Sequence, residues 1–579
     1  MKKRILFLLL FVFFSQQSEA QVDTIKLFIV CQPYRVQSEG QSAYLSLEIK
    51  DECIEAVNIP KLPGTKNGYL TSVHVLLANK SDAQKSISLA VTGENIRGST
   101  ADSIVVPSEK SHLCTLDFVS LNVYDFILNI TVSSGSLNTL INIKCPAKVA
   151  YPIFGTIEHF SRRPPGREAA EKDMAVLKYL PCQVFRVDGP GTWAFQGNPD
   201  YYDWGEADWQ VARIKKLGAR IVMLCGYIPG WVKFNPHDYT KEELKIFLAH
   251  YQKYMAALVR RYSREVDYWE IWNEPELFWF SNKVGSKETE VLYRIIKIAN
   301  SVIRKEDPTA MILTPGFTPD VINCSGPGFA LFDSLQRRGM VDLVDVVCVH
   351  NYPGAYPPAY NKATGATGLL DWLKDFENRA DMGKLKRYLR EKGISKPIWF
   401  TECGLPYDWG ADREAALGFA RMLAINAFDG VQGFIQYETY DYPHDAHPPD
   451  FALVRSSNGQ KSSMFDCYQV LVQALTGAIP APGAVEYQDN QDQKALKYRT
   501  FTRNGELMLV FWNNSLRPKV MKLSSKYSAK RVSLTLLSVQ KDKDFIEQME
   551  FNDKKNELPY IRLEAGGYGI MIVDYLNSQ

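Results

Sequence analysis

Short apolar runs alternate with longer amphipathic segments between residues 149 and 477, and this alternation constrains the fold more than any other feature. A segment after Thr240 has apolar residues at helical spacing from Leu244 to Tyr262, behind a possible Thr-Lys-Glu-Glu capping box. Eight runs are candidate strands: AYPIFGTIEHF, QVFRVDGP, ARIVMLCGY, VDYWEIWNEP, AMILTPGF, VDVVCVHNYP, KPIWFTECG and GFIQYETYD. Eight strands with helices between most of them predict an α/β fold, the (β/α)8 TIM barrel.

A doubly wound open sheet is the alternative α/β fold. That fold favours a phosphate-cradling glycine fingerprint behind a strand, and neither GxGxxG nor GxxxxGK[ST] follows any of the eight runs. The formal net charge is +2, from 67 basic and 65 acidic residues, so no overall field recruits nucleic acid or an anionic membrane. A partner must therefore be recognised at a local site.

All-β domains are expected on both sides of the barrel, because 579 residues exceed one ordinary core. Residues 22–147 contain short alternating runs such as AYLSLEI and FILNITVSS, separated by turn residues, which predict a β-sandwich-like domain. The turn-rich LTGAIPAPGAV marks the end of the barrel, and strand-like runs resume over residues 484–579. The sequence thus predicts a barrel over 149–477 flanked by two all-β domains.

The N-terminus has the three parts of a secretory signal peptide. Met1-Lys-Lys-Arg precedes an apolar stretch that is too short to span a bilayer, and a small residue, Ala20, ends the segment. We expect residues 1–20 to be removed and the mature chain to be exported to the periplasm or beyond the cell, without a membrane span. Export permits disulfides among Cys31, Cys53, Cys114 and Cys145, for which three connectivities are possible.

Polar side chains follow several predicted strands, at the end where barrels carry their chemistry. The fourth strand ends in Asn273-Glu274, the seventh in Thr401-Glu402, and the second carries Arg186. Cleaving a glycosidic bond requires one carboxylic acid to protonate the leaving oxygen, and a second carboxylate to attack the anomeric carbon or to activate water. Two glutamates on strand ends four and seven match this requirement.

The motifs Trp272-Asn273-Glu274-Pro275 and Trp399-Phe400-Thr401-Glu402-Cys403-Gly404 resemble the acid/base and nucleophile motifs of clan A of the glycoside hydrolases. Members of that clan are retaining enzymes on TIM barrels. YWEIWNEPE, GYIPGWV and HNYP are most similar to family 39, which includes β-xylosidases and α-iduronidases. The resemblance covers the predicted barrel.

The resemblance implies a role for each polar residue. Glu274 is the expected general acid/base and Glu402 the expected nucleophile, while Asn273 is expected to bond the sugar 2-hydroxyl. Arg186 is expected to keep Glu402 ionised by its charge. His350 and Tyr352, at the end of the sixth strand, are expected near the nucleophile or the substrate. No metal or other cofactor is implied.

Aromatic residues after the strands are candidates for stacking on sugar rings. We expect substrate contact from Trp231 and Trp279, and loop packing from others such as Trp193. Clan members commonly have a tryptophan at the end of strand eight, whereas this chain offers Tyr437 or Tyr440. Glu270 should share a strand face with Glu274 and lie deeper in the barrel.

A polar cluster after strand eight, His444, Asp445, His447 and Asp450, could bind a metal in principle. Two prolines and the lack of helical spacing favour a polar loop instead.

The leading hypothesis is an exported retaining glycosidase acting on a poly- or oligosaccharide. A non-catalytic sugar-binding barrel and a transglycosylase using the same residues are the alternatives. The sugar, its linkage, endo or exo action and the oligomeric state are left open by the sequence.

Overall fold

The computed structural model describes strands between residues 29 and 145 and most of the chain from residue 152 to residue 575. Between 152 and 575 it omits 159–175, 178, 188–192, 194–195, 308–309, 354–364, 408–410, 441–450, 456–458, 488–494, 504–505, 516, 522, 526–528, 539–543, 553–560 and 565–566. The predicted signal peptide, the pairing of the four N-terminal cysteines and the polar cluster at 444–450 lie outside the described residues.

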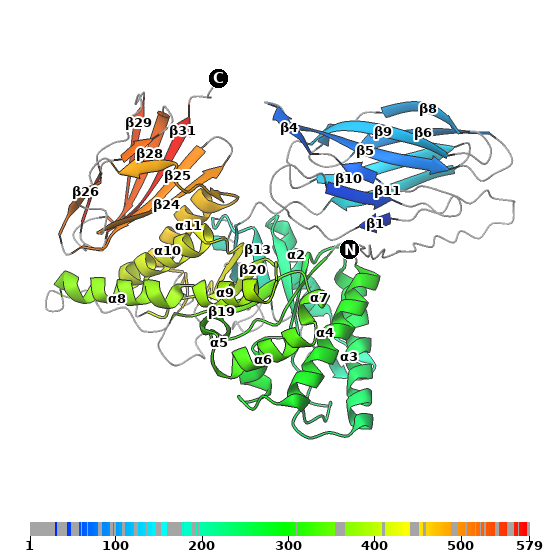
Figure 1. Cartoon of the computed structure of the whole chain (residues 1–579). Coiled ribbons are helices and arrows are strands. Elements are labelled where there is room, and N and C mark those ends of the chain that lie inside the picture. Colours follow the sequence, from blue (N-terminus) through cyan, green and yellow to red (C-terminus); the bar gives the residue numbers. More distant parts are fainter. Residues whose placement is uncertain are drawn as a thin grey trace. The chain divides into compact units, whose positions relative to one another are not determined.

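The chain divides into two compact units: Met1–Val149 with Arg304–Thr309, and Ala150–Ile303 with Ala310–Gln579 (Figure 1). The described part of residues 29–145 forms antiparallel sheets of order β1-β2-β3, β11-β10-β6-β8 and β4-β5-β9-β7, as an all-β region should. Its strands are β1 Ile29–Cys31, β2 Ala43–Leu47, β3 Val57–Ile59, β4 Lys61–Thr65, β5 Gly68–Ala78, β6 Lys85–Thr92, β7 Ile96–Arg97, β8 Thr100–Val106, β9 Ser111–Ser120, β10 Phe126–Ser134 and β11 Leu137–Cys145.

The second unit contains the predicted barrel, and all eight predicted strands are present. They are β12 Ile153–Ile157, β13 Val184–Val187, β16 Arg220–Cys225, β17 Tyr268–Ile271, β18 Met311–Leu313, β19 Val347–Asn351, β20 Ile398–Cys403 and β21 Gly433–Gln436. Their order is β18-β17-β16-β13-β12-β21-β20-β19, and the pairs are parallel. Parallel bridges Leu313↔Val346 and Phe317↔Val349 join β18 to the β19 side and close the ring.

Most residues of these strands are apolar and nearly all are buried, because barrel strands are buried on both faces. Helices follow most of them, as the amphipathic segments predict. The helices are α2 Gly205–Lys216, α3 Lys241–Tyr262, α4 Ser286–Glu306, α5 Asp320–Asn323, α6 Gly326–Arg337, α7 Met340–Leu343, α8 Gly365–Ala380, α9 Gly383–Glu391, α10 Asp412–Phe428 and α11 Ser463–Leu475, with a π-helical turn η3 at Pro275–Trp279 and a hairpin of β14 Gln196–Asn198 and β15 Tyr201–Tyr202.

Helix α3 confirms the predicted capping box. The Thr240 hydroxyl accepts from the backbone N–H of Glu243 at 3.2 Å, and the Glu243 carboxylate accepts from the backbone N–H of Thr240 at 2.7 Å. Two backbone donors that a helix N-terminus leaves unpaired are thereby satisfied. None of the helices in the described residues combines the length and apolar character needed to cross a membrane.

The C-terminal region is a six-stranded antiparallel sheet of order β22-β24-β25-β31-β28-β29, with the small pairs β23-β27 and β26-β30. It shares a hydrophobic core with the barrel helix α10, whose residues Ala415–Ala427 are all buried. The strands are β22 Ile479–Pro480, β23 Val485–Tyr487, β24 Leu496–Arg503, β25 Glu506–Asn513, β26 Lys519–Met521, β27 Leu523–Ser525, β28 Ala529–Leu537, β29 Ile546–Asn552, β30 Ile561–Leu563 and β31 Tyr568–Tyr575.

Candidate active site

The predicted polar residues converge at the carboxyl-terminal ends of four barrel strands. Arg186 lies on β13 and Glu402 on β20, while Asn273 and Glu274 follow β17. His350 lies near the end of β19. All of these residues are at most 8 % exposed, so their charges interact in a largely dehydrated setting.

Arg186 connects three of the other site residues. Its Nη1 donates to Glu402 Oε1 at 2.7 Å, its Nη2 donates to Asn273 Oδ1 at 2.7 Å, and its Nε donates to Glu270. Burial alone would lower the pKa of the guanidinium, but the Glu270 and Glu402 carboxylates outweigh it and raise that pKa. Arg186 is therefore a fixed positive charge, and Glu270 lies deeper in the barrel, as expected from its strand face.

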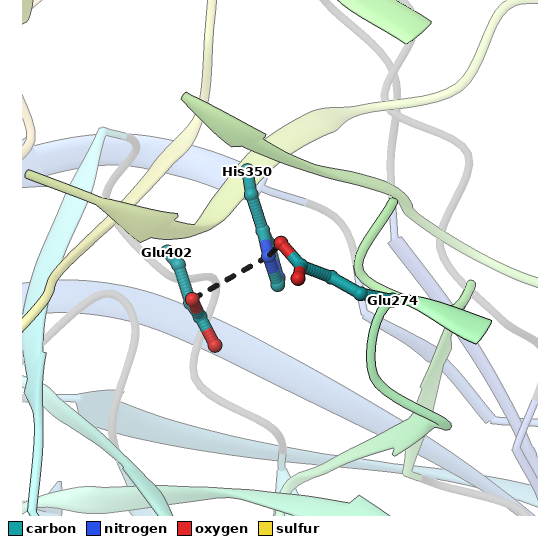
Figure 2. Close-up of side chains that lie close together, drawn as sticks. All are labelled: Glu274, His350 and Glu402. Atoms are coloured by element: carbon teal, nitrogen blue, oxygen red, sulfur yellow. Dashed lines mark hydrogen bonds and ion pairs between the residues drawn. The ribbon is translucent and has the colours of Figure 1, made fainter. Parts of the chain in front are cut away.

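His350 lies between the two predicted catalytic carboxylates (Figure 2). Its Nδ1 is 2.6 Å from Glu274 Oε1 and 3.4 Å from Glu402 Oε2. Burial alone would lower the pKa of the imidazole, but the carboxylates of Glu402 and Glu274 outweigh burial and raise the pKa above its ordinary value. The ring thus links the two carboxylates electrostatically.

Tyr352 holds the second oxygen of Glu402. Its hydroxyl donates to Glu402 Oε2 at 2.6 Å. Burial and the neighbouring Glu402 charge raise the pKa of the phenol well above its usual range, so Tyr352 remains a neutral donor. With Arg186 on Oε1, both oxygens of Glu402 accept hydrogen bonds, which favours the ionised form of the carboxylate.

The turn that carries Glu274 has an unusual backbone. Trp272 and Glu274 have φ values of 79° and 37°, in the left-handed region that side chains other than glycine rarely adopt. The turn is held by neighbouring backbone: Glu274 N–H donates to Gly316 C=O at 2.8 Å, and Asn273 forms a parallel bridge with Gly316. Backbone strain of this kind clusters at functional sites.

Gly316 is a site residue that sequence reasoning missed. A Cβ at this position would lie 2.2 Å from His350 Nε2 and 2.7 Å from Glu270 Oε1, so glycine is required for these side chains to occupy their positions. The sequence shows only a glycine in TPGF, and its importance depends on neighbours from other strands.

The predicted aromatic residues divide into buried and partly exposed groups. Trp193 is fully buried and stacks on Tyr254 with ring centroids 5.5 Å apart, which agrees with the expected packing role. Trp231 and Trp279 are half-buried. Trp279 stacks on Trp272, the residue before Asn273, with ring centroids 4.3 Å apart. Their contact with a substrate stays a prediction.

Tyr437, and not Tyr440, is the aromatic residue beside the site after strand eight. Tyr440 is 1 % exposed, whereas Tyr437 is half-buried, with its ring centroid 6.2 Å from that of Tyr352. Phe451 completes the group: its ring centroid is 5.6 Å from that of Tyr352 and 5.7 Å from that of Tyr437. No motif in the sequence marks Phe451, because the chain returns to the site only in the folded protein.

Glu274, His350 and Glu402 each offer one atom that could bind a metal, and these atoms lie within 4.8 Å of one another. The Arg186 guanidinium 2.7 Å from Glu402 opposes a second cation at this point.

The sequence matches no protein-family model and no curated protein sequence. Among solved structures, the chain is similar to a family 39 glycoside hydrolase from the gut symbiont Bacteroides cellulosilyticus WH2, with TM-score 0.50, 18% identity, 88% of this chain covered and 99% of that one. A family 30 endoxylanase from Clostridium papyrosolvens C71 has TM-score 0.51 and 10% identity, with 73% and 96% covered.

A conserved exported protein from Bacteroides fragilis has TM-score 0.50 and 15% identity, with 74% of this chain and 99% of that one covered. At these identities the likeness concerns the fold. The chain therefore has the fold of the glycoside hydrolases of families 39 and 30, a (β/α)8 barrel joined to all-β sheets, as its motifs predict.

Proposed function

We propose that this protein is an exported glycoside hydrolase that cleaves a poly- or oligosaccharide with retention of anomeric configuration. One observation carries the proposal: one carboxylate oxygen of Glu274 and one of Glu402 lie within 4.8 Å of each other. Retaining enzymes hold the two carboxyl groups about 5–5.5 Å apart, whereas inverting enzymes need about 6.5–9.5 Å to admit a water.

Glu402 is the proposed nucleophile. Its two oxygens accept from Arg186 and Tyr352 at 2.7 and 2.6 Å, which stabilises the carboxylate and fixes its direction. Attack on the anomeric carbon forms a covalent glycosyl ester with Glu402, and the leaving oxygen takes the proton of Glu274. Glu274 then takes a proton from water, which displaces Glu402, and two inversions give net retention.

The surroundings of Glu274 support its role as acid/base. Its Oε1 is 2.6 Å from His350 Nδ1, a group that can exchange a proton with it, whereas no arginine hydrogen bond to Glu274 occurs in the described part of the chain. The difference in environment assigns opposite roles to two identical side chains.

Asn273 is the proposed contact for the sugar 2-hydroxyl. Its Oδ1 accepts from Arg186 Nη2 at 2.7 Å, which fixes the orientation of the amide. The amide NH₂ group has no hydrogen-bond partner among the described residues, so it can donate to a substrate hydroxyl. Such a bond strengthens as charge develops at the anomeric carbon.

Export is proposed from residues 1–20, whose basic, apolar and small-residue parts match a signal peptide. The structural likeness to an exported protein of Bacteroides fragilis supports this proposal.

The test is hydrolysis of a panel of aryl glycosides and polysaccharides by the full chain without residues 1–20, with the first-formed anomer followed by NMR. Release of sugar with retained configuration is the expected result. A product of inverted configuration would make Glu402 a general base, and no hydrolysis of any substrate would leave the sugar-binding alternative.

A further inference from the structure

Two adjacent apolar side chains, Leu277 and Phe278, are exposed beside Glu274. They are 41% and 65% exposed, and we call this pair the ledge. Single exposed apolar residues are normal on a protein surface, and the other large ones in the described residues stand alone in sequence: Val105, Tyr179, Tyr201, Ile246, Ile479 and Val520. An exposed pair next to a catalytic acid therefore calls for a functional explanation.

The ledge is attached directly to the backbone of Glu274. The N–H groups of Leu277 and Phe278 both donate to the Glu274 carbonyl oxygen at 3.0 Å, within the π-helical turn Pro275–Trp279. An acid/base residue gives its proton to the oxygen of the leaving group, so the leaving group lies on the Glu274 side of the scissile bond. The ledge follows Glu274 in the same turn of the chain.

The turn under the ledge is rigidly supported. The carboxylate of Glu276, 1% exposed, accepts from the backbone N–H and the hydroxyl of Thr318 at 2.8 and 2.7 Å. On the other side Trp279 stacks between Trp272 and Phe280, with centroids 4.3 and 4.9 Å away. A surface held in place before binding loses little conformational entropy when a ligand packs on it.

The loop that follows is fixed to its neighbour as well. Glu288 accepts from the Gly285 N–H at 2.9 Å and lies 2.6 Å from Nδ1 of His237, which belongs to the loop after β16. Tyr239 of the same loop donates to the Lys287 carbonyl at 3.0 Å. These contacts connect the loop after β16 to the segment that follows the turn at Pro275–Trp279.

We propose that the ledge binds the first sugar ring on the leaving-group side of the substrate. This inference rests on the proposed function. The C–H face of a pyranose ring is apolar and packs on an aromatic face, whereas its hydroxyls stay in water at the rim. The partner of the ledge is thus a ring with one apolar face, and we assign it to a sugar and not to an aryl aglycone.

The same surface would hold an acceptor sugar in the second step. A hydroxyl oxygen of the acceptor attacks the anomeric carbon, its proton passes to Glu274, and the bond between the anomeric carbon and Glu402 breaks. The ledge therefore favours transfer to sugar over transfer to water when an acceptor is present.

The test compares Phe278→Ala with the unmutated chain on two substrates that share the sugar to be released. The first substrate is a disaccharide, chosen from xylobiose, cellobiose, mannobiose and galactobiose as the one that the unmutated chain cleaves fastest. The second substrate is the glycosyl fluoride of the sugar that this disaccharide contains. Fluoride has no ring to rest on the ledge. We expect kcat/KM for the disaccharide to fall about tenfold more than kcat/KM for the fluoride, and the ratio of transfer to hydrolysis with added disaccharide to fall as well.

Tyr179→Ala is the matched control, because Tyr179 is 54% exposed and precedes β13, at the opposite end of the barrel. It should leave both substrates unaffected. Three results would contradict the proposed role of the ledge and leave the glycosidase proposal standing. They are equal losses of Phe278→Ala on both substrates, no loss on either substrate, and cleavage of the fluoride alone by the unmutated chain. If Phe278→Ala lost kcat/KM on a 4-nitrophenyl glycoside but not on the disaccharide, the ledge would bind an aryl aglycone and not a sugar. A chain that cleaves nothing would overturn the proposed function, and the ledge with it.

Discussion

Nδ1 of His350 lies 2.6 Å from Oε1 of Glu274, although 76 residues separate them in the sequence. The imidazole is fully buried, and the same Nδ1 lies 3.4 Å from Glu402 Oε2. A proton on this ring compensates two carboxylates at once. The protonation of His350 therefore couples the stability of the site to pH.

The free energy of unfolding should fall as pH rises through the raised pKa of His350. The native state holds the His350 proton more tightly than the unfolded chain, where the pKa of histidine is about 6.5. The stabilisation that this proton gives is therefore complete below about pH 6.5 and is lost as pH rises through the raised pKa of the native state. Urea unfolding between pH 6 and pH 9 measures the effect, with His350→Gln as the variant that should lack it. Identical pH profiles for the two proteins would contradict the prediction.

Glu402→Ala should abolish turnover, and added azide should restore part of it with a glycosyl azide of inverted configuration as product. The small anion fits the space left by the carboxylate and attacks from the same face. NMR of the azide product gives the configuration. Near-native activity of Glu402→Ala on an activated substrate would remove Glu402 as nucleophile.

Glu274→Ala should show a loss that depends on the leaving group. Without the acid, cleavage of a substrate with a poor leaving group should slow by about 10²–10⁴-fold, whereas a dinitrophenyl glycoside, which needs no proton, should form the intermediate at close to the native rate. Pre-steady-state release of dinitrophenol separates the two steps. Equal losses on both substrates would argue against Glu274 as acid.

Tyr352→Phe should lower kcat about tenfold to a hundredfold. The change removes a buried donor at 2.6 Å from a charged acceptor, a bond worth about 1.5–3 kcal/mol. Thermal unfolding serves as the control, since a loss of activity caused only by unfolding would appear there. Unchanged kcat in a folded variant would show that Arg186 alone orients Glu402.

Gly316→Ala should destabilise the protein by about 1–3 kcal/mol and reduce activity, because the new methyl group overlaps His350 and Glu270. Gly230→Ala is the matched control: a Cβ there meets nothing within 4 Å, so the free energy of unfolding should change by no more than about 0.5 kcal/mol. Similar behaviour of the two variants would refute the steric argument.

The sequence alone was enough to predict the eight barrel strands, the capped helix at 241–262 and the strand ends that carry Glu274 and Glu402. These features depend on short-range patterns: burial on both faces makes a strand apolar, and a helix start needs donors and acceptors three residues apart. Because parallel strands of a closed barrel end at one rim, strand order along the chain was also enough to bring the polar ends together.

The contacts within the site were decided by the tertiary structure. Arg186 reaches Glu402 across 216 residues of sequence and divides its donors among Glu270, Asn273 and Glu402. The choice of Tyr437 over Tyr440 likewise follows from which side chain the neighbouring strands bury. Local patterns place a residue on a strand end, but its rotamer and its hydrogen-bond partners depend on side chains from other strands, which meet only when the barrel closes.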